Sequence, residues 1–525
     1  MQELLKGESP PDIYWSRVNC DEAATDILSP LCWSYWRNGI EWGTRAGWSK
    51  IGLLSPAQVM IPQAPSERIV NCFYGRMAIN VHTTCRLMGA VPGASPEDIE
   101  RDLLGSVRTD APTIEPMRIP KGRLALKGIT NVIRHTTTVR RLHAEQFAWW
   151  SHIVANEPAS SDLRLYLDES LSRFCQAMEV HTVSRTFVLG AQARLSAATR
   201  KAGRPDLFLS IFSGFGGVVE TDLAHRIWEI RTHRKEPGPF LARYGFHGIH
   251  EGNLTGRSWR ECPSSIFTDY TVQSTDSPAA LATRAAAAHA DSMRELKNFL
   301  SRRERASVYA LCRFAAVHIR NSELTKEMCL MAIDAARLGA RRVGRQLEEQ
   351  GIIDDVEDVF MCTWDELRPE VPPHELSAQL HFRRSRMEEY RGIEIPIAFK
   401  GMPTVLEKSE PSVLPGEGLQ GIAAASGRTI GRARVLTAPN QRFTPGDVLV
   451  CRVCDPSWTP VIMLAAGLVI DVGGTASHAA IIARELGIPC VIGTRDGTKR
   501  ILTNTLVHVD GDGGVVRPVD DLDGI

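Results

Sequence analysis

A histidine lies at the expected start of a helix, directly after a turn of small residues. The segment GGTASH, residues 473–478, follows the apolar run LVIDV and precedes AAIIAREL. Two glycines let the backbone turn sharply, and Thr475 and Ser477 are good N-cap residues. Unpaired amides and the helix dipole favour an anion in the first helical turn, where His478 is expected. Because neutral imidazole is nucleophilic near physiological pH, His478 is placed to accept and pass on a phosphoryl group.

The other residues of this segment are expected to support that chemistry. Gly473, Gly474, Thr475 and Ser477 form the turn, and Arg484 in the following helix pairs with phosphate or with an acidic neighbour. Spacing alone leaves a second interpretation open, because Gly-Gly before a helix is common. In that interpretation the histidine is a capped surface residue on an ordinary strand-to-helix turn.

Composition divides the chain into parts that position this segment. Pro and Gly accumulate over 401–420, which is typical of a linker. After it, short β-branched runs such as DVLVCRV and LVHVDGD alternate with Gly, Pro and Asp, and one helix over 477–486 stops at Gly487. We therefore expect a multidomain α+β protein, with a large mainly helical domain over 1–400 and a compact α/β domain over 421–525.

The long middle of the chain is expected to be helical. Residues 121–350 have mostly helical patterns, and the run 278–320 is rich in Ala, Leu, Arg and Glu, which are strong helix formers. A second long helix is expected over 325–350, ending at Gly351. Nearer the N-terminus the pattern is mixed, and the segment 71–91 reads as a strand that continues as a helix.

Two C-terminal segments carry a resemblance to a known family. GGTASHAAIIARELGIPCVIG, residues 473–493, and PGDVLVCRVCDPSWTP, residues 445–460, resemble the mobile phosphohistidine domain of phosphoenolpyruvate-utilising enzymes. That family includes phosphoenolpyruvate synthase, pyruvate phosphate dikinase and rifampin phosphotransferase. Its phosphorylated histidine stands between the small-residue turn and the AIxAR helix, which is the position of His478. The resemblance implies a swivelling phosphohistidine domain on a hinge linker.

The resemblance extends upstream, with a departure. WSRVNCDEAATDILSPLCWSYW (15–36), FLARYGFHGIHEGNLTGRSWRECP (240–263) and GIIDDVEDVFMCTWDEL (351–367) look like blocks of the acceptor-binding domain of rifampin phosphotransferase and its relatives. Those relatives usually show His-Arg after Tyr-Gly, whereas this chain has Phe246-His247. We therefore expect a changed acceptor pocket.

The helical domain is expected to bind a small organic acceptor in an apolar pocket with a few polar groups. Phosphoryl transfer to a hydroxyl needs a base for the proton and cations near the moving group. The candidates are His247 as base, Glu251 as its orienter, and Arg320 or Arg243 as phosphate partners. An ordinary structural role is equally open for each. Candidates to line an aromatic part of the pocket, or simply to pack in the core, are Trp33, Trp36 and Trp149.

No element that would charge the histidine is recognised in the sequence. P-loop and protein-kinase signatures are absent. The acceptor-like region begins by Asp12, which leaves no room for an ATP-grasp domain, and too few residues follow the motif for a phosphoenolpyruvate-binding barrel. The resemblance therefore points to a separate ATP-grasp-type partner, as in split phenylphosphate synthase. ATP and Mg²⁺ are expected on that partner, with no cofactor or metal on this chain.

Composition favours a cytoplasmic protein. Lys plus Arg and Asp plus Glu number 61 each, so no overall field attracts nucleic acid or an anionic membrane. The N-terminus lacks a secretion signal pattern, and no apolar run approaches the roughly 20 residues that span a bilayer. The 12 cysteines are scattered, and the single CxxC, Cys451 to Cys454, has no second half of a zinc site.

Three functions remain open at this point. The first is a phosphotransferase subunit that receives a phosphoryl group on His478 from the partner and passes it to a small-molecule acceptor. The second is a phosphohistidine carrier that acts on another protein, with the helical domain as a docking module. The third is an enzyme that needs no phosphate and uses His478 as acid or base. The long acceptor-like region favours the first.

Overall fold

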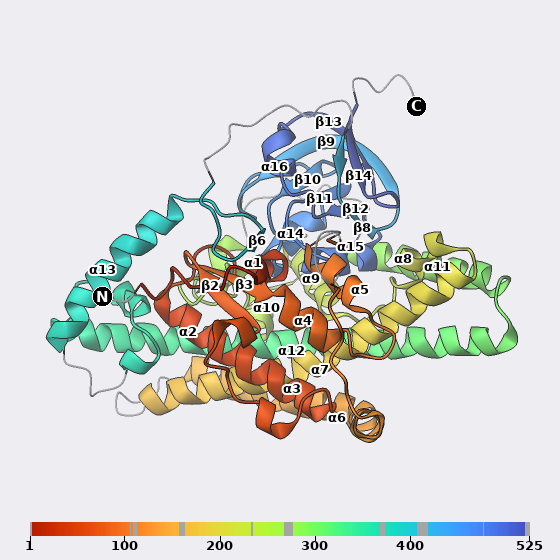
Figure 1. Ribbon diagram of the computed structural model, residues 1–525. Helices are drawn as coiled ribbons and strands as arrows, with labels where there is room; N and C mark the ends of the chain where they lie inside the picture. The colour runs from red at the N-terminus through yellow and green to blue at the C-terminus, as the bar shows by residue number, and fades with distance from the viewer. Residues whose placement is uncertain are drawn as a thin grey trace.

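The computed structural model describes residues 3–104, 107–108, 113–156, 163–232, 235–266, 277–367, 373–406, 418–475 and 477–519. A mainly helical body carries an eight-stranded α/β unit on one side (Figure 1). The expected linker over 401–420 falls partly on 407–417, which lie outside the described residues, and its last two residues already belong to the eight-stranded sheet. The expected domain boundaries stay predictions.

Three long helices form the base of the body: α6 (Lys121–Ala155), α7 (Leu163–Lys201) and α12 (Arg302–Glu349). The hydroxyl of Tyr166 on α7 donates to the carbonyl of Ala335 on α12 at 2.7 Å. The indole of Trp150 on α6 donates to Asp334 on α12 at 2.8 Å. These buried hydrogen bonds tie both neighbours to α12, which is 48 residues long.

The expected boundary between two helices near residue 321 is wrong, because α12 runs through it without a break. The break lies earlier, between α11 (Pro278–Lys297) and α12. There Ser301 caps α12, and the Glu304 side chain accepts from the Ser301 amide at 2.9 Å, which completes a capping box. This local start signal outweighs the continuous helix-forming composition on either side of it.

A small antiparallel sheet, ordered β2-β3-β1-β6, covers one end of the body. The strand-then-helix pattern expected over 71–91 is present as β2, β3 and α4. The elements here are β1 (Tyr14–Ser16), α1 (Val18–Ala23), α2 (Pro30–Asn38), the π-helix η1 (Gly39–Thr44), α3 (Arg45–Lys50), β2 (Val70–Phe73), β3 (Arg76–Asn80), α4 (Val81–Met88), α5 (Pro96–Leu104) and β6 (Ala398–Lys400).

Shorter elements connect the body. They are α8 (Phe208–Ile211), α9 (Val219–Arg231), α10 (Pro237–Tyr244), β4 (Gly248–Ile249), β5 (Arg257–Ser258) and α13 (Pro373–Arg391). The Gly-rich segment 213–217 forms the turn between α8 and α9.

The C-terminal sheet has the order β7-β14-β13-β9-β10-β11-β12-β8, and β9 to β12 are parallel. Strands β10 and β11 are buried along their whole length, as expected for parallel strands covered on both faces. The elements are β7 (Leu419–Gln420), β8 (Ile422–Ala425), β9 (Arg428–Leu436), β10 (Val448–Cys451), α14 (Thr459–Ile462), β11 (Gly467–Ile470), α15 (His478–Leu486), β12 (Cys490–Ile492), α16 (Gly497–Arg500), β13 (Leu506–Asp510) and β14 (Val515–Pro518).

Helix α15 lies between this sheet and the helical body, as Figure 1 shows. Ala480 and Ile482 share an apolar cluster with Ile470 of the sheet and with Ile227 of α9. Ile481 packs instead into a cluster with α7 and α12. Every residue of α15 is buried, so the sheet and the body meet through this helix.

A buried carboxylate anchors the π-helix to the small sheet. Glu41 accepts the amides of Ile69 and Val70 at 2.6 and 2.9 Å, and its second oxygen accepts from Arg45 at 3.1 Å. Burial raises the pKa of this carboxyl, whereas the amides and the guanidinium favour its charged form. Glu41 therefore links η1 to the start of β2.

We predict that Glu41→Ala destabilises the folded protein by about 3–5 kcal/mol, because it leaves a buried guanidinium without its carboxylate. Urea unfolding followed by circular dichroism measures the change. Glu97→Ala, at an exposed position on α5, is the matched control and should leave the midpoint nearly unchanged. Equal effects of the two variants would contradict the anchoring role.

Candidate functional site

The turn before α15 is built as its sequence suggests. Ser477 is the N-cap and accepts from the amide of Ala480 at 3.1 Å, and Gly487 ends the helix in the left-handed conformation, with φ of 65°. A Cβ on Gly473 would collide with the side chain of Ile492. The helix expected over 477–486 is present as His478–Leu486 with Ser477 as its cap, its stop at Gly487 is confirmed, and His478 is its first residue.

Side chains of the α/β unit and of the helical body hold this turn in place. Arg484 donates to the carbonyl of Thr475 at 2.6 Å. The Thr475 hydroxyl donates to Asp102 of α5 at 3.1 Å and accepts from Gln192 of α7 at 3.3 Å. Gly474 passes close to the same Asp102 carboxylate. In this arrangement Thr475 and Arg484 fix the backbone around the histidine, and their part in phosphate binding stays a prediction.

His478 is only 1% exposed and contacts three groups. Its Nδ1 lies 3.0 Å from Oε1 of Glu220, in the first turn of α9. Its Nε2 lies 3.4 Å from the hydroxyl of Thr459. Its backbone amide donates to the carboxylate of Glu22, which follows Asp21 on α1. A carboxylate from the helical body therefore occupies the anion-favouring end of α15.

The charge of Glu220 is retained despite its burial. Burial alone would raise the pKa of this carboxyl, but the contact with His478 and the nearby Lys326 outweigh it, so the pKa lies well below the usual glutamate range. Lys326 Nζ is 3.7 Å from the same Oε1. An ionised carboxylate at Nδ1 favours the tautomer with hydrogen on Nδ1, which leaves the Nε2 lone pair available as a nucleophile.

A cavity of about 340 Å³ opens beside His478. It is lined by groups from α1, the α2-η1-α3 run, β2, β3, α4, α7 and α12, and by Pro456 and Ile481 of the α/β unit. The apolar side chains that line it include Trp36, Ile40, Trp48, Met77, Ile79 and Met88. Of the three candidate tryptophans only Trp36 lines it. The cavity has the size and polarity of a small-molecule site.

Two cations and three carboxyl groups line the polar part of this cavity. Arg185 of α7 and Lys326 of α12 are the cations, and the carboxyl groups belong to Glu22, Glu251 and Glu323. Within the described parts of the chain, no hydrogen bond or ion pair is found for Arg185. Burial raises the pKa of Glu323 above the usual glutamate range, and the adjacent charge of Glu220 raises it further, so this group holds a proton more readily.

Sequence reasoning missed Arg185, Lys326, Glu220, Glu22 and Glu323. One weak signal was available for two of them. Glu323 and Lys326 are three residues apart on α12, so they share a face, and that face continues into the buried Leu330 and Ile333. A charged pair on an otherwise buried face indicates a polar site inside the fold.

His247 and Glu251, which the sequence analysis suggested as a base and its orienter, lie in contact. Nδ1 of His247 lies 2.8 Å from Oε2 of Glu251. Burial lowers the pKa of His247, but Glu251 and the more distant Glu220 outweigh it, so the pKa is raised overall. Glu251 lines the cavity, whereas the His247 ring packs against Phe246 and Trp259 behind it. Their catalytic roles stay predictions.

The two predicted phosphate partners do not line the cavity. Arg320 donates to the carbonyls of Gly216 and Phe215 at 2.8 and 2.7 Å. The amides of the same two residues donate to Glu485 of α15, so Arg320 braces the turn that receives α15.

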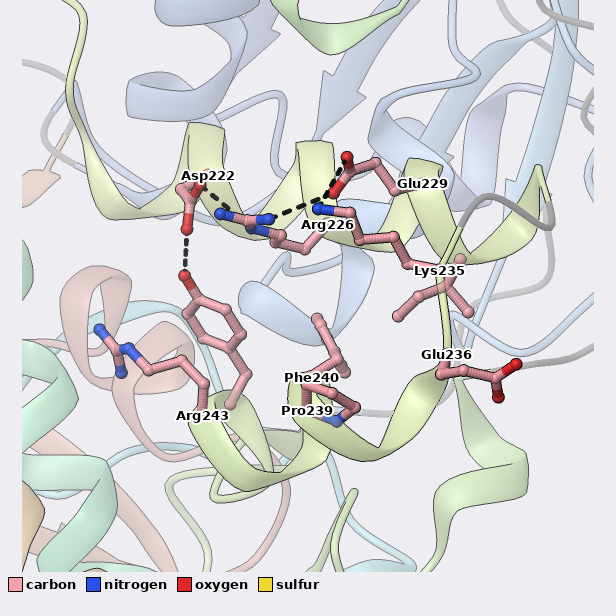
Figure 2. A pocket seen from close by; sticks show the side chains of 10 residues that line it. Asp222, Arg226, Glu229, Lys235, Glu236, Pro239, Phe240 and Arg243 are labelled. Atoms are coloured by element: carbon pink, nitrogen blue, oxygen red, sulfur yellow. Dashed lines mark hydrogen bonds and ion pairs between the residues drawn. The ribbon is translucent and has the colours of Figure 1, made fainter.

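Arg243 donates to Glu327 at 2.9 Å and borders a different pocket, between α9 and α10 (Figure 2). There Arg226 and Lys235 pair with Glu229, and the Tyr244 hydroxyl donates to Asp222. Because these charges satisfy one another, that pocket is a weaker site than the cavity at His478.

Comparison with known proteins identifies the segment that carries His478. Residues 443–514 match the family described as PEP-utilising enzyme, mobile domain. The match covers β10, α14, β11, α15, β12, α16 and β13, so the mobile-domain segment includes the histidine turn and most of the parallel strands. The family resemblance expected from the sequence is therefore confirmed for this part of the chain.

Curated relatives match over part of their length. The uncharacterized phosphotransferase YvkC of Bacillus subtilis is 36% identical over 197 residues, which cover 35% of this chain and 24% of that protein. Rifampicin phosphotransferase of Bacillus subtilis is 34% identical over 175 residues, covering 33% and 20%. The uncharacterized protein Rv2047c of Mycobacterium tuberculosis is 33% identical over 207 residues, covering 39% and 24%. The matches span about a quarter of the length of these relatives or less.

Similarity to a solved structure is weak. The NMR structure of Enzyme I (nEIt) shares 20% identity over 37% of this chain and 54% of that chain, with a TM-score of 0.15, too low to compare the folds. Among the described residues, no group of three or more His, Cys, Asp or Glu side chains is arranged to hold a metal ion. No helix in the described ranges has the length and apolarity to cross a membrane.

Two ion pairs hold the mobile-domain segment against the body. Arg452 pairs with Asp21 at 2.7 Å, and Lys499 pairs with Glu394 at 2.8 Å. Asp21 also binds Arg17 at 2.6 Å, so its carboxylate is fixed from both sides. Burial would raise the pKa of Asp21, but the two guanidinium groups keep it below its usual range. These pairs stand at the edge of the contact that buries His478.

We predict that Arg452→Ala combined with Lys499→Ala increases the reaction of His478 with diethyl pyrocarbonate severalfold, because partly exposed ion pairs contribute up to about 1 kcal/mol each. Mass spectrometry of the modified peptide measures the rate. Arg428→Ala, which removes a pair with Asp510 inside the α/β unit, is the control and should leave the rate unchanged. A double variant that reacts at the wild-type rate would show that these pairs do not keep His478 buried.

Proposed function

We propose that this protein is a phosphotransferase subunit that carries a phosphoryl group on His478 to a small organic acceptor bound in the adjacent cavity. The single observation that carries the proposal is the position of His478. It lies on the mobile-domain segment, opens on a cavity of about 340 Å³ and has a carboxylate at Nδ1. Relatives named as phosphotransferases support the same class of reaction.

The first step charges the histidine. Nε2 of His478 attacks the phosphorus of the donor, an N–P bond forms, and the bond from phosphorus to the leaving oxygen breaks. Glu220 would hold the hydrogen on Nδ1 and offset the positive charge that develops on the ring. The donor is proposed to be a separate ATP-grasp-type partner, and ATP and Mg²⁺ are assigned to that partner.

The second step transfers the phosphoryl group from His478 to the acceptor. The acceptor hydroxyl attacks phosphorus, the N–P bond breaks, and the hydroxyl proton passes to a base. We propose Glu251 as the base in place of His247, because Glu251 faces the cavity whereas His247 lies behind it and orients Glu251. Arg185 and Lys326 would stabilise the charge on the moving phosphoryl group, in the role first assigned to Arg320 or Arg243.

The mobile-domain segment would leave its present contact to be charged and return to it for transfer. Such a motion fits an α/β unit joined to the body through the 401–420 segment. The alternative of a carrier that phosphorylates a protein is less well supported, because His478 faces a cavity of small-molecule size and is almost fully buried.

Labelling tests the proposal directly. Full-length protein is incubated with ATP labelled at the β-phosphate and a candidate ATP-grasp partner, and acid-labile label is measured. We predict label on the wild type and none on His478→Ala, because no other residue would carry the phosphoryl group. His508→Ala, on β13 of the same unit, is the matched control and should label normally. Label on His478→Ala, or none on the wild type with any donor, would reject the proposal.

A second prediction separates charging from transfer. Arg185→Ala should accept label on His478 normally but discharge it to an acceptor on the order of 100-fold more slowly, because loss of one preorganised donor to a developing charge costs about that much. Single-turnover discharge measures the rate. Arg320→Ala and Arg243→Ala should discharge at close to the wild-type rate, since neither side chain lines the cavity. Slow discharge in Arg320→Ala or Arg243→Ala, with normal discharge in Arg185→Ala, would restore the first assignment.

A further inference from the structure

A second imidazole, that of His181 on α7, lines the same cavity and has no part in the transfer described above. Its Nδ1 lies 3.0 Å from the hydroxyl oxygen of Thr325. That hydroxyl donates its only hydrogen to the carbonyl of Ser322, at 2.8 Å. With that hydrogen committed to Ser322, we assign the contact with His181 to a hydrogen on Nδ1.

The second ring nitrogen of His181 is consequently a lone-pair acceptor. Burial and the nearby cations Arg185 and Lys326 together lower the pKa of His181 to about 3, against an opposing contribution from the backbone of Ser322, so the ring is neutral. No partner for Nε2 is found among the residues that the structure describes. The ring keeps some exposed surface although it lies inside the fold, and the space it borders is the cavity.

The volume and the lining residues of the cavity limit the kind of molecule that it can bind. A cavity of about 150 Å³ holds benzene, so about 340 Å³ accommodates a body of roughly 12 non-hydrogen atoms. Trp36, Trp48 and Met77 are among the apolar side chains that line it. The proposed transfer uses Arg185 and Lys326 for the phosphoryl group, so a molecule with its own carboxylate would find no further Arg or Lys among the described residues that line the cavity.

We infer that the acceptor is a neutral, largely apolar molecule with two polar hydrogens: the hydroxyl that is phosphorylated, and a second O–H or N–H that donates to Nε2 of His181. This inference rests on the proposed function, in which the proton of the reacting hydroxyl goes to Glu251. Because one hydroxyl carries one hydrogen, the lone pair on His181 requires a second donor. His181 is then the residue that selects the acceptor.

Binding to the full-length protein without any phosphoryl donor tests the inference, so that a negative result is separate from the labelling of His478. The probes are 2,7-dihydroxynaphthalene, its monomethyl ether 7-methoxy-2-naphthol, and 7-hydroxy-2-naphthoic acid, and isothermal titration calorimetry gives each Kd. We expect the diol to bind about tenfold more tightly than the monomethyl ether, which lacks one donor. The acid should bind more weakly than the diol.

Variants assign the difference to His181. His181→Phe should bind the diol and the monomethyl ether within twofold of each other, and His181→Gln, which keeps an acceptor oxygen, should restore a preference for the diol. His152→Gln, at an exposed position on α6, is the control and should match the wild type. Circular dichroism checks that each variant is folded.

Three results would overturn the inference: equal Kd values for the diol and its ether in the wild type, an unchanged preference in His181→Phe, or tightest binding of the acid. Failure of all three probes to bind at millimolar concentration would also overturn it, because a site of this size and polarity should hold at least one of them. In each case the labelling of His478 would still decide the proposed function.

Discussion

The first turn of α15 lies between two carboxylates of the helical body, and the arrangement of the site depends on this contact. Glu220 meets the Nδ1 side of His478, and Glu22 accepts its backbone amide. These contacts fix the position of the first turn of α15 and the orientation of the His478 ring. Since Glu22 and Glu220 come from α1 and α9, which are almost 200 residues apart, the site exists only when the whole body is folded.

The contact combines a tight apolar part with a polar edge. Apolar residues of α15 pack against α9 on one side and against α7 and α12 on the other. Ion pairs such as Arg452 with Asp21 stand at the rim, where partial exposure limits their contribution to stability. Apolar packing therefore contributes most to keeping the histidine buried, and the motion in the proposed function would have to separate this packing.

Features that depend on residues close together in the sequence were predictable, whereas features that depend on contacts between distant helices were not. Ser477, Gly487 and the β-branched strands were predictable, because caps, turns and strands are encoded within a few residues. The pairing of His247 with Glu251 followed from short spacing and a plausible chemistry. Arg185 and Glu220 were not predictable, because nothing in the local sequence shows which helices meet at the cavity, and Lys326 had only the weak signal of its spacing from Glu323. The local sequence also did not show that Arg320 and Arg243 contact the turn before α9 and Glu327, and their proposed part in phosphate binding stays a prediction.

The carboxylates around His478 would favour transfer of the phosphoryl group from the histidine to the acceptor in the proposed reaction. A phosphoryl group on Nε2 brings about two negative charges to a histidine whose Nδ1 and backbone amide already face Glu220 and Glu22. Burial raises the pKa of Glu22, which lowers the cost of holding it neutral there, but Glu220 stays ionised. Charge repulsion therefore opposes docking of the phosphorylated histidine, and Arg185 and Lys326, the cations among the described residues that line the cavity, offset it. Transfer to the acceptor relieves the repulsion at the histidine, so the carboxylates that seat the unphosphorylated His478 also favour the release of its phosphoryl group.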